Sequence, residues 1–81
     1  MHVKLGLYRH YKGNMYQVIG VARHTESGEA LVVYQALYGS YTLWVRPLSM
    51  FVEKVHDDGV VVDRFTYLDA PLEHPFLQEN S

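Results

Sequence analysis

Cysteine is absent from this sequence of 81 residues. No disulfide can therefore cross-link the fold, and no cysteine-ligated zinc site can substitute for a core. A large excess of one charge is also absent, because seven Lys and Arg residues stand against nine Asp and Glu, a net charge of −2. This balance excludes broad electrostatic attraction to nucleic acid by the whole molecule, but it allows a local basic surface.

Long apolar runs are missing as well. No stretch approaches the ~20 residues that cross a bilayer as a helix, so we expect no contact with a membrane. Residues 1–7 lack the apolar region and the cleavage site of a signal peptide, and we expect a cytoplasmic location. Stability must come from packing, and a hydrophobic content of 48% is enough for one thin core.

What the sequence has in abundance is β-branched and aromatic residues, including seven tyrosines. Such side chains suit a pleated, half-buried sheet. Turn signals recur along the chain, and no stretch keeps the 3.6-residue apolar rhythm of a helix. We predict strands over residues 4–10, 15–25, 30–38, 41–46 and 60–67, with a short 3₁₀ turn over 47–51.

These features predict an all-β fold, specifically a five-stranded SH3-like barrel over residues 1–68. An irregular tail, residues 69–81, would pack on the barrel or on a partner. Gly20 lies in the middle of the second strand, where a bend lets one strand serve both halves of a small barrel. An OB-like barrel is the alternative, although it usually has a helix between its third and fourth strands, and Gly39-Ser40 leaves no room for one.

The central hairpin, residues 15–38, decides this fold. A loop at residues 26–29 would pair Thr25 with Ala30, and both faces of the hairpin are then largely apolar. Since a sheet with one wet face would alternate apolar and polar residues, both faces need cover. The barrel interior covers one face, and the tail or a second copy covers the other. A self-pairing face in this register contains Ile19, Val21, Tyr34 and Ala36.

Short motifs run along most of the chain. They are Gly6-Leu7-Tyr8-Arg9-His10-Tyr11-Lys12-Gly13, Gly20-Val21-Ala22-Arg23-His24, Leu31-Val32-Val33-Tyr34, Ala36-Leu37-Tyr38-Gly39, Leu43-Trp44-Val45-Arg46-Pro47 and Met50-Phe51. Together, over about residues 5 to 66, the chain resembles the bacterial domain-of-unknown-function family 1653. The resemblance implies a small bacterial β-barrel protein and no established activity. Asp63 departs from the pattern, which has a proline there.

An aromatic and basic set of residues is the main candidate site. We expect Leu43 and Val45 to point inward, so that Trp44 and Arg46 project together from the opposite face. Aromatic rings stack on bases and basic side chains neutralise phosphates, so the mixture suits a nucleic acid or a nucleotide. The predicted ligand-binding residues are Arg9, Tyr11, Lys12, Arg23, His24, Trp44 and Arg46.

Other interpretations of the same residues remain open at this point. Trp44 can instead pack under the tail, with Arg46 paired to Glu53 or to an aspartate. His10 and His24 have no partners at ligand spacing, so we predict no metal site and no cofactor. No serine lies in a nucleophile elbow, so we predict no catalytic residue.

Three functions follow. The first is a non-enzymatic binding module for a nucleic acid or nucleotide. The second is a protein-peptide interaction or homodimerisation module, because Trp, Tyr and Arg are also enriched at protein-binding hot spots. The third is an accessory of a nucleotide-processing enzyme.

Overall fold

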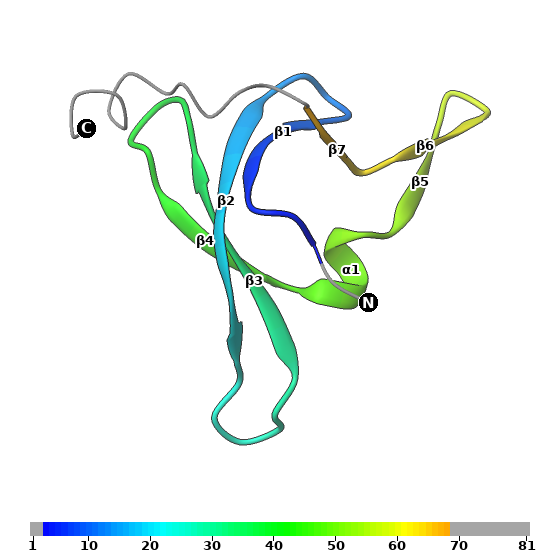
Figure 1. Ribbon diagram of the computed structural model, residues 1–81. Helices are drawn as coiled ribbons and strands as arrows, with labels where there is room; N and C mark the ends of the chain where they lie inside the picture. The colour runs from blue at the N-terminus through cyan, green and yellow to red at the C-terminus, as the bar shows by residue number, and fades with distance from the viewer. Residues whose placement is uncertain (1–2, 69–81) are drawn as a thin grey trace.

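The computed structural model describes residues 3–68 (Figure 1). The predicted tail, residues 69–81, lies outside the described residues, and so does the cover that it was expected to provide. The elements in chain order are β1 (Gly6–His10), β2 (Met15–Arg23), β3 (Ala30–Ala36), β4 (Leu43–Pro47), α1 (Leu48–Phe51), β5 (Lys54–Asp57), β6 (Val60–Asp63) and β7 (Phe65–Tyr67). A single turn of helix among the strands of the described chain confirms the all-β class.

Five strands form one antiparallel sheet in the order β4-β3-β2-β1-β7, and β5 pairs with β6 in a separate hairpin (Figure 1). Within residues 3–68 the sheet does not close on itself, so β4 and β7 are its two edges. The closed barrel predicted from the sequence is therefore not observed; the structure shows an open five-stranded sheet.

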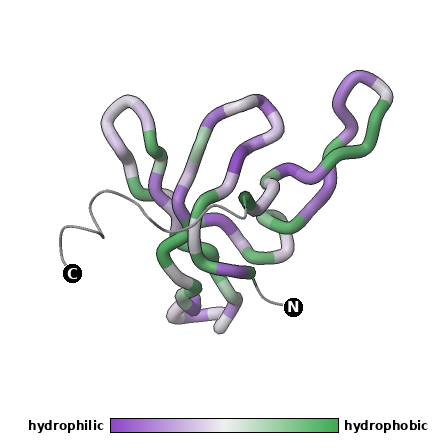
Figure 2. Tube along the Cα trace, turned by 45° about the horizontal axis from the view of Figure 1, so that its top comes forward, coloured by the Kyte–Doolittle hydropathy of each residue, from purple (hydrophilic) through white to green (hydrophobic). Residues whose placement is uncertain are grey.

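The last predicted strand, residues 60–67, is divided into β6 and β7. Asp58 and Gly59 both adopt positive φ, 57° and 84°, which is the conformation of a tight two-residue hairpin turn. This turn pairs β6 with β5, whereas β7 pairs with β1. In Figure 2 the β5–β6 hairpin has one hydrophilic and one hydrophobic strand, because β6 begins with three valines.

The β2–β3 hairpin closes over a longer loop than predicted. Arg23 pairs with Ala30, and His24 organises the loop between them. The His24 amide donates to the carbonyl of Glu29 at 2.8 Å, and its Nδ1 accepts from the amide of Glu26 at 3.1 Å. The pairing is displaced by two residues from the predicted register, which leaves each side chain near the loop on its predicted face.

A register shift between Val18 and Gly20 then exchanges the two faces of β2. This irregularity lies where the sequence predicts a bend, at Gly20. Beyond it Val18 is buried, with 1% of its surface exposed, whereas Ile19 is 48% exposed. The predicted self-pairing face is therefore wrong, because Tyr34 and Ala36 are buried while Ile19 and Val21 are exposed.

The core lies on one face of the sheet, which we call the core face. Phe51 from α1 and Phe65 from β7 stack there, with ring centroids 4.1 Å apart and planes 5° from parallel. The core cluster consists of Tyr8, Val18, Val32, Tyr34, Leu48, Phe51 and Phe65. The 3₁₀ turn predicted at 47–51 is a single α-helical turn, and its Leu48 and Phe51 are the residues that it buries.

Strand β4 faces the opposite way from the prediction. Trp44 lies opposite Tyr34 and Arg46 lies opposite Val32, so both share the core face. Leu43 and Val45 lie on the other face and are 58% and 60% exposed. Their predicted inward direction is wrong because the buried Val32 and Tyr34 of β3 fix which residues of β4 share the core side.

Candidate ligand-binding site

Trp44 lies at the margin of the core face, and 51% of its surface is exposed. The alternative in which Trp44 packs under the tail involves residues 69–81, which lie outside the described residues. Arg46, two residues further on the same strand, is half-buried. Its predicted ion pair with Glu53 is not formed, because Glu53 pairs with Arg64 at 3.4 Å.

A row of aromatic rings crosses the sheet from Tyr34, the backbone neighbour of Trp44, toward β1. Tyr34 stands opposite Trp44 on β3, and its ring centroid is 5.4 Å from that of Tyr16 on β2. The Tyr16 hydroxyl shares a hydrogen bond with that of Tyr38. Burial, together with this hydrogen bond, raises the pKa of Tyr16 to about 12. The row is therefore held by ring packing and by the hydrogen bond between the Tyr16 and Tyr38 hydroxyls.

The row continues to His10 at the end of β1. The His10 ring centroid lies 6.3 Å from Tyr16 and 5.0 Å from Phe65. Its Nδ1 accepts a hydrogen bond from the amide of Lys12 at 3.1 Å. Burial and the positive charges of Arg64, Arg46 and Lys12 lower the pKa of His10. Arg64, Arg46 and Lys12 are thus close enough to act on the His10 charge, and Arg64 is also paired with Glu53; we call these three residues the cationic cluster beside His10.

Arg64 is a site residue that sequence reasoning missed. Its side chain is 22% exposed and one of its guanidinium nitrogens pairs with Glu53. Within the described residues its buried Nε has no hydrogen-bond partner. Residues 60–67 were predicted as one continuous strand, whereas the strand is interrupted at Arg64, between the end of β6 and the start of β7. Recognising this break would have marked Arg64 as a candidate.

The other predicted site residues divide into two groups. Tyr11 joins the cluster, since its ring centroid is 4.6 Å from that of His10 and the Lys12 ammonium lies 5.8 Å from its centre. Arg9 is exposed on the opposite face of β1. Arg23 and His24 lie at the far loop, where the Arg23 guanidinium donates to the carbonyl of Gly28 at 2.9 Å. The structure therefore places Tyr11 and Lys12 beside His10 and sets Trp44 and Arg46 on one face of β4, and it separates Arg9, Arg23 and His24 from both pairs.

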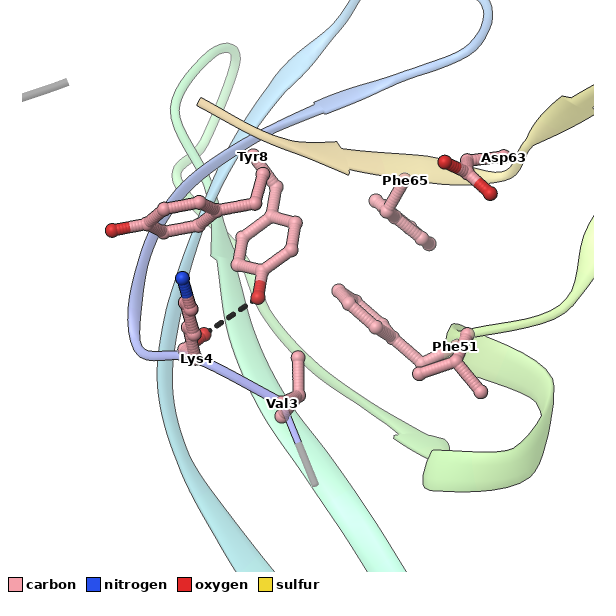
Figure 3. A pocket seen from close by; sticks show the side chains of 8 residues that line it. Val3, Lys4, Tyr8, Phe51, Asp63 and Phe65 are labelled. Carbon is pink, nitrogen blue, oxygen red and sulfur yellow. Dashed lines mark hydrogen bonds between the residues drawn. The ribbon is translucent and has the colours of Figure 1, made fainter. Parts of the chain in front are cut away.

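A cavity of about 320 Å³ lies on the other side of Phe65 (Figure 3). Half of its eight lining residues are aromatic, namely Tyr8, Phe51, Phe65 and Tyr67. The remaining lining residues are Val3, Lys4, Val52 and Asp63. The size is at the lower end for sites that hold small molecules.

Only two charged residues line this cavity, and both already interact within the protein. The Lys4 ammonium lies 5.0 Å from the centre of the Tyr67 ring, and Asp63 pairs with Lys54 at 2.7 Å. The Tyr8 hydroxyl donates to the carbonyl of Lys4 at 2.7 Å. The cavity therefore suits a small planar group, whereas the cationic cluster beside His10 suits an anion.

Across residues 3–68, no three His, Asp or Glu side chains gather as they would around a metal ion. In the same part of the chain, no helix has the length and apolar character needed to cross a membrane.

Comparison with known proteins gives the family. The profile described as "Protein of unknown function (DUF1653)" matches residues 6–67. The crystal structure of a DUF1653 protein from Bordetella bronchiseptica is 37% identical in sequence, with a TM-score of 0.76 over 82% of this chain and 87% of that one. No curated protein matches. The motifs noted in the sequence, the profile and this structural likeness agree, and the chain belongs to the DUF1653 family.

Proposed function

We propose that the protein is a non-enzymatic binding module for a nucleotide or a single-stranded nucleic acid. The ligand would lie along the Trp44–His10 surface, which we define as Trp44, Arg46, Tyr16, Tyr38, His10, Tyr11, Lys12 and Arg64. The carrying observation is the half-exposed Trp44 on the same face of β4 as Arg46, whose charge acts on His10 in the cationic cluster. We also propose that the sheet is an SH3-like barrel left open, supported by its strand order, in which the last strand pairs with the first, and by the helical turn after β4.

The chemistry of the surface supports this ligand class. Exposed aromatic rings accept bases by stacking, at about 1–3 kcal/mol per base, without sequence preference. Lys12, Arg46 and Arg64 supply the phosphate contacts. Each neutralised phosphate makes the affinity fall more steeply with salt concentration. Three contacts to a single-stranded ligand therefore predict that the logarithm of the association constant falls with the logarithm of the salt concentration with a slope of about −2. Binding is therefore expected to be modest and sensitive to salt.

The test uses the fluorescence of Trp44, since the chain has one tryptophan. Short single-stranded RNA, single-stranded DNA and nucleoside triphosphates are titrated at low salt. We expect quenching of Trp44 and about a tenfold weaker affinity for Arg46→Gln. Arg23→Gln removes the same charge from the far loop and serves as the matched control, with unchanged affinity. The proposal fails if no titration changes the emission, or if the two variants bind equally.

The second candidate function is binding of a protein or peptide, and a different observation favours it. Leu43 and Val45 lie on the face away from the core and are among the most exposed apolar residues of the described chain. Single exposed apolar residues are ordinary, but these two flank Trp44 on an edge strand. Capture of peptides by the wild-type protein that is lost in Leu43→Ser, with nucleic-acid binding absent, would favour this function over the first.

A further inference from the structure

Strand β4 is an edge that lacks the usual protection. Unpaired edge strands are normally guarded by charges, prolines or bulges, because their free N–H and C=O groups attract other strands. Here Leu43, Trp44 and Val45 follow one another at 58%, 51% and 60% exposure, and the described residues place no strand beside them. Arg46 and Pro47 protect only one end.

The backbone groups that face outward from β4 can be identified. The amide of Ala36 donates to the carbonyl of Thr42 at 2.9 Å, and these residues lie directly opposite in the register. Hydrogen-bonded pairs alternate along an antiparallel ladder, so Trp44 and Arg46 also direct their N–H and C=O groups toward β3. Leu43 and Val45 therefore direct theirs toward the free edge.

We propose that β4 pairs antiparallel with β4 of a second copy of the chain, with the two-fold axis passing between the two Trp44 residues. In this register Leu43 lies opposite Val45 of the other copy, and the reciprocal pair is identical by symmetry. Because both residues face the free edge, the two pairs exchange four backbone hydrogen bonds. Two open sheets would thereby become one continuous ten-stranded sheet.

The ends of β4 exclude the neighbouring registers. An axis at Val45 would set Leu43 opposite Pro47, which has no N–H to donate. An axis at Leu43 would require Tyr41 to pair, but Tyr41 has a φ of 57° and cannot continue a strand. The Trp44 register alone pairs both the N–H and the C=O groups of Leu43 and of Val45.

The same register is favourable for the side chains. Leu43 of each copy meets Val45 of the other on the face away from the core, and apolar side chains that stand opposite each other stabilise a strand pair. Arg46 lies opposite Thr42, so no like charges meet. The strand is thus complementary to itself in hydrogen bonding, apolar pattern and charge, and this favours a second copy over an unrelated peptide. A contact through one short strand predicts a dimer that depends on concentration.

Sedimentation velocity over a range of concentrations tests the proposal, with Val45→Pro as the main variant. The Val45 N–H does not serve the β3 ladder, so proline is tolerated there within the protomer but removes two of the four intermolecular hydrogen bonds. Val45→Thr keeps the N–H and the branched shape and is the matched control. We expect a wild-type dimer whose dissociation constant rises about tenfold or more in Val45→Pro and far less in Val45→Thr. Thermal unfolding checks that both variants fold.

A cross-link gives a second readout, since the natural chain has no cysteine. Residues opposite each other in a non-hydrogen-bonded pair have Cα atoms about 4.5 Å apart, which is within disulfide range. Trp44→Cys should therefore oxidise to a covalent dimer, whereas Thr42→Cys should not, because it would face Arg46. A wild-type monomer at every concentration, or a dimer unaffected by Val45→Pro, overturns the proposal. A monomeric wild-type protein that loses much of its stability in Val45→Pro also overturns the proposal, because another segment of the same chain would then pair with the β4 edge.

Discussion

Phe51→Ala tests the packing that holds the site together. Phe51 is 1% exposed; it stacks on Phe65, and its ring meets those of Tyr8 and Tyr34 edge-on, at 5.4 Å in each case. Truncating a buried Phe to Ala costs about 3–5 kcal/mol of the free energy of unfolding. Each aromatic pair contributes about 0.5–1.5 kcal/mol more than its buried surface area alone would give. The ring also walls the cavity, so water can enter the space left behind. We therefore expect a loss of about 4 kcal/mol.

That loss is large for a chain of this size. At roughly 0.1 kcal/mol per residue, the whole domain is stable by about 8 kcal/mol. The variant should stay folded but lose about half of its free energy of unfolding, and its Tm should fall by about 16–32 °C. Urea denaturation and thermal unfolding followed by circular dichroism measure both quantities. Val52→Ala, at a neighbouring residue that is 41% exposed, is the control and should cost under about 1 kcal/mol. A loss below about 1 kcal/mol for Phe51→Ala would refute the stacked core.

Three further predictions concern titration and surface charge. The pKa of His10 in the folded protein is lowered from 6.5, so as the pH falls the imidazole takes up a proton in the unfolded chain before it does so in the folded one. The free energy of unfolding should therefore decrease as the pH drops below 6.5, and urea titrations should show a smaller decrease for His10→Gln. The pKa of Tyr16 is raised from 10.0 to about 12, so the contribution of its hydroxyl to the free energy of unfolding is complete below pH 10 and is lost as the pH rises through 12. Between these pH values Tyr16→Phe should lose less stability than the wild type, and equal losses would contradict this. The Lys54–Asp63 pair is 64% and 50% exposed, so Lys54→Ala should change the unfolding free energy by no more than about 1 kcal/mol.

The elements of the fold were largely predictable from the sequence because turn chemistry is local. Gly13 adopts a φ of 111° in the turn after β1, and Asp58-Gly59 makes the turn between β5 and β6. These residues are recognisable because few others adopt such backbone angles without cost. The strand limits that follow from them agree with the structure to within a few residues.

Register was not predictable, because it depends on contacts between distant segments. The loop was expected at residues 26–29, but the side chain of His24 bonds back to the loop amides and lengthens it. The shift between Val18 and Gly20 then exchanged the faces of β2, and neither event leaves a distinct pattern in the sequence. The inward side of β4 was assigned wrongly for the same reason, since it is inherited from β3.

The candidate site was predicted in part. Trp44 and Arg46 were paired correctly, because alternation along one strand places them on one face whichever way that face points. Arg64 was missed because its strand was predicted as continuous through residues 60–67. Arg23 was included for its charge alone, and the structure places it at the far loop. Predictions made within one β-strand were therefore correct, and those that needed the register between distant strands were not.

Binding of a nucleic acid to the Trp44–His10 surface is tested most directly by an amide and indole NMR titration of the full chain with a short single-stranded oligonucleotide at low salt. We expect chemical-shift changes at the Trp44 indole, at Arg46, and at His10 to Lys12, with the amides of the loop from His24 to Gly28 unchanged. Shifts confined to that loop, or no shifts at any residue, would contradict the assignment of the Trp44–His10 surface.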